Sequence, residues 1–172
     1  RKKTPISLHI ITDLEHKKYM NRIGTKSMVQ EARHLFGDVQ HLFNADSPVC
    51  LYQWNIEMFS RIVTNCDLAV IPLDPRNPMA MGKPENKLVL FWRMAMPTVV
   101  TASPSYVRAM EICGSDLYCR NNADWHEKLE RLIGDSAARK TAAMLGKQCA
   151  DRVYSEEVYL GQWDRLFQSV LQ

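Results

Sequence analysis

Two stretches of sequence decide the fold, Asp67-Leu-Ala-Val-Ile-Pro-Leu-Asp74 and Gly82-Lys-Pro-Glu-Asn-Lys-Leu-Val-Leu-Phe-Trp-Arg-Met-Ala-Met-Pro-Thr-Val-Val-Thr101. The run from Leu68 to Leu73 is short, apolar and rich in β-branched residues, as expected for a strand buried on both faces. Apolar residues at helical spacing follow, and Thr98-Val-Val-Thr101 has strand character again. We therefore predict a βαβ unit whose loop, residues 74–83, lies at the carboxyl end of its first strand. In open α/β sheets, ligands bind at this edge.

The start of the predicted helix carries positive charge where a helix is already positive. Pro84 suits the first helical position, and Glu85 complements the helix dipole. Lys83 and Lys87 oppose that dipole, at a cost of about 0.3–1 kcal/mol per charge. An anion such as a diphosphate, held between the lysines and the free N–H groups, would offset this cost. The alternative is that both lysines point into water beside Glu85.

The length and composition of the chain fit one globular domain. The chain has 172 residues, of which 46% are hydrophobic and 24% charged, and its net charge of +3 is too small to indicate nucleic-acid binding. No apolar run approaches the roughly 18 residues that a membrane span needs. The five cysteines form no C-x-x-C pair, so we expect reduced, packed thiols in a cytoplasmic protein and no zinc site. They are Cys50, Cys66, Cys113, Cys119 and Cys149.

The remaining pattern alternates strands with helices, which predicts a mostly parallel sheet with helices on both faces and a helical C-terminal tail. Asn55 is a suitable N-cap for the helix that precedes Asp67. In the second half we expect a helix over residues 107–112 and another that starts at Asp124, whose spacing to Glu127 is that of a capping box. Five strands are predicted, over residues 6–12, 49–54, 68–73, 98–101 and 117–120.

Common catalytic and nucleotide-binding motifs are absent. There is no P-loop, G-x-G-x-x-G, G-x-S-x-G or H-E-x-x-H sequence, and no D-x-D triplet that would favour a metal-dependent nucleotide-sugar site. Trp54 follows a predicted strand at the ligand-binding edge. It is either an aromatic platform that stacks on a base or lines a pocket, or a core residue that caps the sheet.

The central stretch resembles a known family. Asn86-Lys-Leu followed by Met94-Ala-Met-Pro-Thr-Val-Val100 resembles the "N-K-L-x-E-x-M-A-x-G-x-P-V-V" signature of group-one glycosyltransferases, in the donor-binding half of the GT-B fold. The likeness covers most of the chain from about Val49 onward. Four shorter stretches are also similar to family motifs: Cys66–Leu73 ("a-D-v-x-i-x-P-L"), Gly82–Lys87 ("g-K-x-x-N-K/R"), the turn Ser103-Pro-Ser-Tyr106 and Tyr154-Ser-Glu-Glu157 ("f-S-x-E").

The resemblance implies a Rossmann-like three-layer domain that binds the nucleotide diphosphate of a sugar donor. A glycosyl group, of the hexosyl kind, would pass to a glycan, lipid-linked or other acceptor, as in polysaccharide biosynthesis, with lysine and helix amides in place of a metal or other cofactor. Lys83 would contact the diphosphate with help from Asn86, and Lys87 is a second candidate. The other implied donor-binding residues are Gln53 and Trp54 near the base, and Ser105 and Tyr106 at the border of the cleft.

Two positions depart from the family pattern. Leu90 stands where the family has a glutamate that often binds ribose, and the family's glycine falls at Ala95-Met96. A degenerate, non-catalytic Rossmann-like scaffold is therefore the alternative function. A nucleotide-sugar epimerase would need acid and base residues at the cleft, and no such set is visible.

We expect residues 1–172 to form a single domain that is a fragment of a longer two-domain protein. The acceptor domain, and with it the catalytic residues, would be missing. Such a fragment is expected to bind donor weakly and to be inactive alone. Any peripheral association with a membrane would occur through the missing half.

Overall fold

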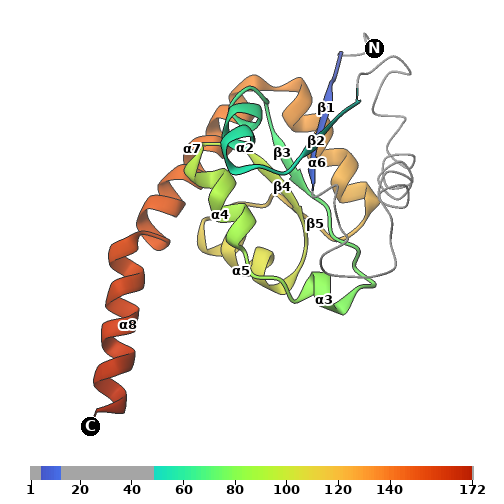
Figure 1. The fold of residues 1–172 in the computed structure, drawn as a ribbon. Helices are drawn as coiled ribbons and strands as arrows, with labels where there is room; N and C mark the ends of the chain where they lie inside the picture. The colour runs from blue at the N-terminus through green and yellow to red at the C-terminus, as the bar shows by residue number, and fades with distance from the viewer. Residues whose placement is uncertain (1–4, 13–48, 172) are drawn as a thin grey trace, which may run out of the picture. The chain divides into compact units, whose positions relative to one another are not determined.

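The computed structural model describes residues 5–12 and 49–171 (Figure 1). They belong to two compact units, Arg1–Asn65 (unit 1) and Cys66–Gln172 (unit 2), each of which is described by itself. In the parts of the chain that the structure describes, no helix is both long and apolar enough to cross a membrane.

Unit 1 contains a two-stranded parallel sheet. Strands β1 (Leu8–Thr12) and β2 (Val49–Gln53) pair in parallel. Helix α2 (Ile56–Val63) follows, and the Asn55 side chain accepts hydrogen bonds from two backbone N–H groups of its first turn, at 2.8 and 3.3 Å. The predicted N-cap at Asn55 is confirmed.

Unit 2 is a three-stranded parallel sheet with helices. The strand order is β3-β4-β5, and the central strand β4 is buried along its whole length, as a parallel sheet covered on both faces requires. The elements are β3 (Ala69–Ile71), α3 (Pro78–Met81), α4 (Asn86–Arg93), β4 (Thr98–Thr101), α5 (Pro104–Ile112), β5 (Tyr118–Cys119), α6 (Asn122–Gly134), α7 (Ser136–Val153) and α8 (Glu156–Val170).

The α/β fold class is thus confirmed, with each of the five predicted strands present. The strands form two small parallel sheets, one in each unit, and their character is compatible with a Rossmann-like fold. The GT-B organisation and the single-domain prediction stay predictions. The segments expected between residues 13 and 48 lie outside the described residues.

Several helix starts differ from the predictions. Helix α5 begins at Pro104, three residues before the predicted start, because Ser103 acts as N-cap and accepts a bond from the Tyr106 N–H. Helix α6 begins at Asn122, because Asn121 is the N-cap and its side chain accepts a hydrogen bond from the Asp124 N–H. The Asp124 carboxylate in turn accepts a bond from the Arg120 N–H. A capping box at Asp124 as N-cap is therefore wrong. Helix α3, within the predicted loop, was not predicted.

Helix α4 ends with a residue in the left-handed conformation. Ala95 has φ 53°, and the N–H groups of Ala95 and Met96 bond back to the carbonyl groups of Trp92 and Phe91, closing the helix. Glycine is favoured in this conformation because a Cβ meets steric resistance there.

Replacing Ala95 with glycine is expected to stabilise the protein. The left-handed conformation costs an L-residue roughly 1–2 kcal/mol, which glycine does not incur, although glycine also makes the unfolded chain more flexible. We therefore expect a net gain of up to about 1 kcal/mol in the free energy of unfolding, measured by urea denaturation. Ala95→Val should lower the stability, and a stable Ala95→Val variant would contradict this account.

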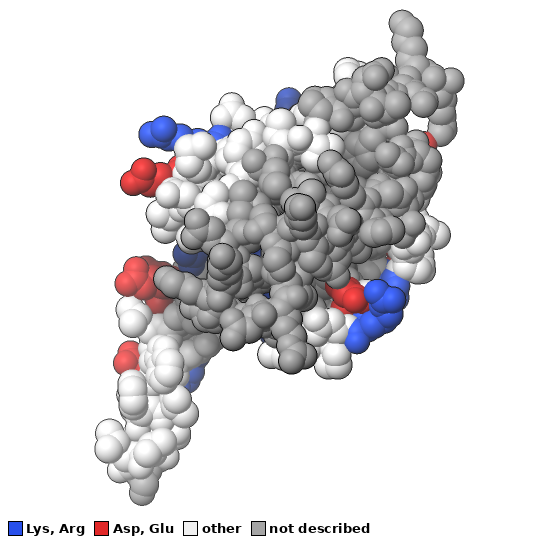
Figure 2. Space-filling view, turned by 45° about the vertical axis from the view of Figure 1, so that its right-hand side comes forward, with Lys and Arg blue, Asp and Glu red and all other residues white. Residues whose placement is uncertain are grey.

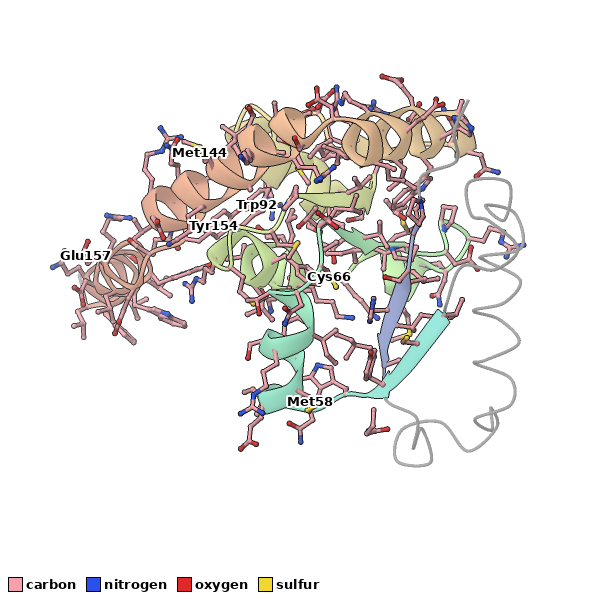
Figure 3. All side chains as sticks on the ribbon, turned by 90° about the horizontal axis from the view of Figure 1, so that it is seen from above. Met58, Cys66, Trp92, Met144, Tyr154 and Glu157 are labelled. Atoms are coloured by element: carbon pink, nitrogen blue, oxygen red, sulfur yellow. A yellow bond between two sulfur atoms is a disulfide. The ribbon has the colours of Figure 1, made fainter. Side chains whose placement is uncertain are left out.

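Helix α4 is held against α7 by a close backbone approach. Gly146 of α7 faces the indole of Trp92, and a Cβ added at Gly146 would lie only 2.8 Å from the indole Nε1. Tyr154, at the end of α7, lies beside the same tryptophan, with ring centroids 6.4 Å apart (Figure 3). Arg93 donates a 2.8 Å hydrogen bond to the Tyr154 carbonyl. These contacts fix the orientation of α4.

The cysteine prediction is wrong for one pair. Cys113, at the end of α5, and Cys149 of α7 form a disulfide, with Cα atoms 5.6 Å apart. Both residues are buried, and Cys50, Cys66 and Cys119 lie outside this disulfide. Disulfides persist mainly in oxidising compartments, and the predicted cytoplasmic location stays a prediction.

Candidate functional site

The carboxyl ends of β3 and β4 are joined directly. The Thr101 hydroxyl accepts a 2.7 Å hydrogen bond from the Leu73 N–H and donates to the Leu73 carbonyl at 3.3 Å. Since Leu73 follows β3 and Thr101 ends β4, the loops after both strands start at one edge of the sheet. This edge is where the sequence predicts a ligand.

Lys83 and Ser105 come together at this edge, although 22 positions separate them. The Ser105 hydroxyl donates a 2.6 Å hydrogen bond to the Lys83 backbone carbonyl. That bond fixes the loop in front of α4 against the first turn of α5, and it leaves the Lys83 side chain exposed. The structure thus brings two of the predicted site residues into contact, whereas their role in ligand binding stays a prediction.

The N-terminus of α4 has free hydrogen-bond donors. Glu85 is the N-cap residue, but its side chain makes no capping bond. Because α4 begins at Asn86, Pro84 lies outside the helix, and its predicted place at the first helical position is wrong by two residues. None of the described residues supplies an acceptor for the backbone N–H groups of Asn86, Lys87 and Leu88. Such a terminus attracts anions through its donors and its dipole.

Glu85 is occupied by other partners. The Arg108 guanidinium donates to both carboxylate oxygens, at 3.0 and 3.2 Å, and the Tyr154 hydroxyl donates to one of them at 3.4 Å. The Glu85 side chain is only 15% exposed, whereas that of Arg108 is 61% exposed. This carboxylate therefore balances Arg108 and is not free to neutralise the two lysines.

Burial and charge also act on Lys87. Partial burial of its ammonium group, and then the positive charge of Lys83, lower the pKa of Lys87 below its ordinary value of 10.5. Its neighbour Asn86, the first residue of α4, is exposed. An anion that binds beside two such positive charges stabilises the protonated form of the lysine, because it offsets the repulsion between the charges.

The Glu85–Arg108–Tyr154 group was not predicted from the sequence. Burial and the Glu85 charge raise the pKa of the Tyr154 hydroxyl to about 12, so this phenol remains a hydrogen-bond donor at neutral pH. Tyr154 lies 69 positions from Glu85, and no local spacing signals such a contact. Glu85, in front of α4, and Arg108, in α5, lie 23 positions apart, and this separation gives no signal either.

Tyr106 is buried. Its side chain is only 1% exposed, and burial followed by the charge of Glu85 raises the pKa of its hydroxyl. The ring therefore belongs to the core of unit 2, and a place for Tyr106 at the border of the cleft stays a prediction.

Gln53 and Trp54 lie in unit 1, at the carboxyl end of β2. The Trp54 side chain is 54% exposed, so the alternative of a core tryptophan is wrong. The Trp54 N–H donates to the Thr12 carbonyl at 2.8 Å, which extends the parallel pairing of β1 and β2 by one residue. The contact of both residues with a nucleotide base stays a prediction.

Comparisons with models of known protein families, with curated proteins and with solved structures found no match. Within residues 5–12 and 49–171, no group of three or more His, Cys, Asp or Glu residues is placed to hold a metal ion. The chemistry of the site therefore has to be argued from its own residues.

Proposed function

We propose that unit 2 binds the diphosphate of a nucleotide sugar and forms the donor half of a glycosyltransferase. One observation carries the proposal: Lys83 and Lys87 flank the uncapped N-terminus of α4 at the ligand-binding edge of a parallel sheet. The adjacent acid, Glu85, is already held by Arg108 and Tyr154. A diphosphate supplies the negative charge and the acceptor oxygens that this arrangement lacks.

The same groups suit the chemistry of glycosyl transfer. When a sugar leaves its nucleotide, negative charge develops on the terminal phosphate of the nucleoside diphosphate. Fixed N–H donors and ammonium groups stabilise that charge without a metal ion. The α4–α7 contact at Trp92 and Gly146 keeps these donors in place, and such preorganisation makes them effective.

The test is a thermal-shift screen of the chain against UDP, GDP, ADP and their common sugars, with inorganic pyrophosphate as the minimal ligand. At about a hundred times the dissociation constant, a ligand adds roughly 2.7 kcal/mol of stability. We expect a shift with one nucleotide and its loss in Lys83→Ala. The alanine keeps the backbone carbonyl that Ser105 bonds, so the loop should keep its place.

Lys140→Ala is the matched control. Lys140 is an exposed residue of α7 with the same charge. It lies 14 residues before Tyr154, or about 21 Å along the helix from the end that contacts Glu85. Equal losses in both variants would mean non-specific attraction. The absence of a shift with every ligand at millimolar concentration would contradict donor binding by this chain.

One observation favours the scaffold alternative. Leu90, which replaces the family's glutamate, is 45% exposed, so it presents an apolar surface where a ribose-binding carboxylate would stand. A scaffold would show no nucleotide-dependent shift. A transferase that has lost ribose contacts would still bind pyrophosphate through Lys83, so the pyrophosphate arm of the screen separates the two.

The lowered pKa of Lys87 predicts a pH dependence for anion binding. Only the protonated form attracts the anion, so affinity is full below this pKa and falls as the pH rises through it. For Lys87 that fall should begin below the range of an ordinary lysine near 10.5. Calorimetric titration with pyrophosphate measures it. Lys87→Arg keeps its charge across this range and should delay the fall to higher pH, and coincident profiles would refute a role for Lys87.

A further inference from the structure

The last helix, α8, presents a large apolar face that the described residues do not cover. It is a helix of 15 residues without one buried side chain. Figure 1 shows α8 extending from the end of α7, away from the three-stranded sheet of unit 2. Its exposed large apolar residues, together with the one that follows it, are Tyr159 (44%), Leu160 (55%), Trp163 (55%), Leu166 (50%), Phe167 (59%), Val170 (74%) and Leu171 (86%).

These residues form one continuous stripe. Leu160, Trp163, Phe167 and Val170 follow the alternating three- and four-residue spacing of helices that pack side by side, and the other three residues flank them. Within the stripe the rings of Trp163 and Phe167 stack, with centroids 5.8 Å apart. The opposite face is mostly polar, with Glu157, Gln162, Asp164, Arg165, Gln168 and Ser169 beside Val158 and Gly161. Glu156 lies one turn before Leu160, at the start of the stripe.

Exposure of this stripe is unfavourable for two reasons. Each apolar side chain left in water forgoes the free energy that its burial would supply. In addition, helices of about this length are marginal in water unless an apolar face packs on something. The stripe is therefore expected to be covered in solution.

A membrane surface is a poor candidate for the cover. Helices that lie in the membrane interface carry lysine and arginine on the polar face, where anionic lipids attract them. In α8 the only basic residue is Arg165, against Glu156, Glu157 and Asp164. Figure 2 shows mostly uncharged side chains on the face of the projecting helix that is turned to the viewer.

We propose that α8 pairs with the α8 of a second copy of this chain. At their exposed fractions, three aromatic side chains of about 150–250 Å² each offer roughly 240–400 Å² of exposed area per copy, and the four aliphatic side chains add to this area. A stable interface buries about 800 Å² per partner. Tyrosine and tryptophan are also the residues that carry most binding energy in interfaces. A two-fold axis near Trp163 lets the same stripe serve both copies.

The test is sedimentation velocity of the full chain over a hundred-fold range of concentration, with circular dichroism to measure helix content. We expect a dimer whose population rises with concentration. The substitutions Trp163→Glu and Phe167→Glu should weaken dimerisation by at least about 100-fold each, because a charge is then placed in the centre of the interface. Both side chains are exposed, so the variants are expected to fold.

Gln162→Glu and Gln168→Glu are the matched controls, because they add the same charge to the polar face of the same helix. Both should dimerise like the wild type. A chain that sediments as a monomer at every concentration would overturn the proposal, and so would a dimer that persists in Trp163→Glu. Binding of the wild-type chain to neutral phosphatidylcholine vesicles, lost in Trp163→Glu, would assign the stripe to a lipid surface and overturn it as well.

Discussion

Replacing Gly146 with alanine is expected to lower the free energy of unfolding by about 2 kcal/mol, because α7 can then no longer approach α4. The added Cβ would lie 2.8 Å from Nε1 of Trp92, closer than carbon atoms of real side chains come to their neighbours. Trp92 is only 3% exposed, so its indole has no open space to move into. Overpacking of this kind typically costs 1–3 kcal/mol, and the helix propensity of alanine returns about 1 kcal/mol at most.

Urea denaturation followed by circular dichroism measures the loss, and Gly134→Ala is the matched control. Gly134 ends α6, and a Cβ there would have no atom within 4 Å. Its alanine variant should be as stable as the wild type or slightly more stable. If both alanine variants behave alike, the close approach of α7 to Trp92 is refuted.

Testing Gly146→Ala in a Trp92→Ala variant distinguishes a steric clash between the added Cβ and Trp92 from a general effect of alanine on α7. Trp92→Ala removes the indole, at a cost of about 3–5 kcal/mol by itself. In that background Gly146→Ala should be nearly neutral. The double variant should therefore lose less stability than the sum of the losses in the two single variants. Strict additivity would show that alanine disturbs the helix for a reason unrelated to Trp92.

The Gly146→Ala substitution is also expected to weaken ligand binding at the candidate site. Helix α4 carries Lys87 and begins at the free N–H groups, and Tyr154 of α7 donates to Glu85 in front of it. A shift of α7 away from Trp92 therefore displaces the partner of Glu85. We expect pyrophosphate binding to weaken in Gly146→Ala and not in Gly134→Ala.

The strands could be predicted from the sequence because their signals are local. Thr98 to Thr101 is a β-branched run, and the structure buries each of these residues in the central strand of unit 2. Helix starts were less accurate, because several residues compete to be the N-cap. At α6 the spacing of Asp124 to Glu127 favoured Asp124, whereas the N-cap in the structure is Asn121.

Half of the candidate site could be predicted, for a physical reason. Lys83 and Lys87 oppose the helix dipole, which is visible in the sequence, and Ser105 follows a strand that ends at the same edge. Arg108 and Tyr154 could not be found, since their contact with Glu85 depends on how α5 and α7 pack against α4. The burial of Tyr106 is likewise a result of packing.

Loss of the Cys113–Cys149 disulfide is expected to destabilise the protein by roughly 4 kcal/mol. The bond closes a loop between residues 36 positions apart, and the chain entropy removed from the unfolded state by a loop of this size corresponds to about that free energy. It also ties α7 to the end of α5, so its loss should loosen the same helix that supports α4.

The measurement compares the oxidised wild type with a Cys113→Ala, Cys149→Ala double variant in urea. Reductant should lower the stability of the wild type towards that of the variant and leave the variant unchanged, which separates the bond from the loss of two sulfur atoms. Cys66→Ala is a control, because Cys66 is not part of the Cys113–Cys149 disulfide. Unfolded without reductant, the wild type should expose three reactive thiols, whereas five would refute the disulfide and restore the interpretation of all five cysteines as reduced.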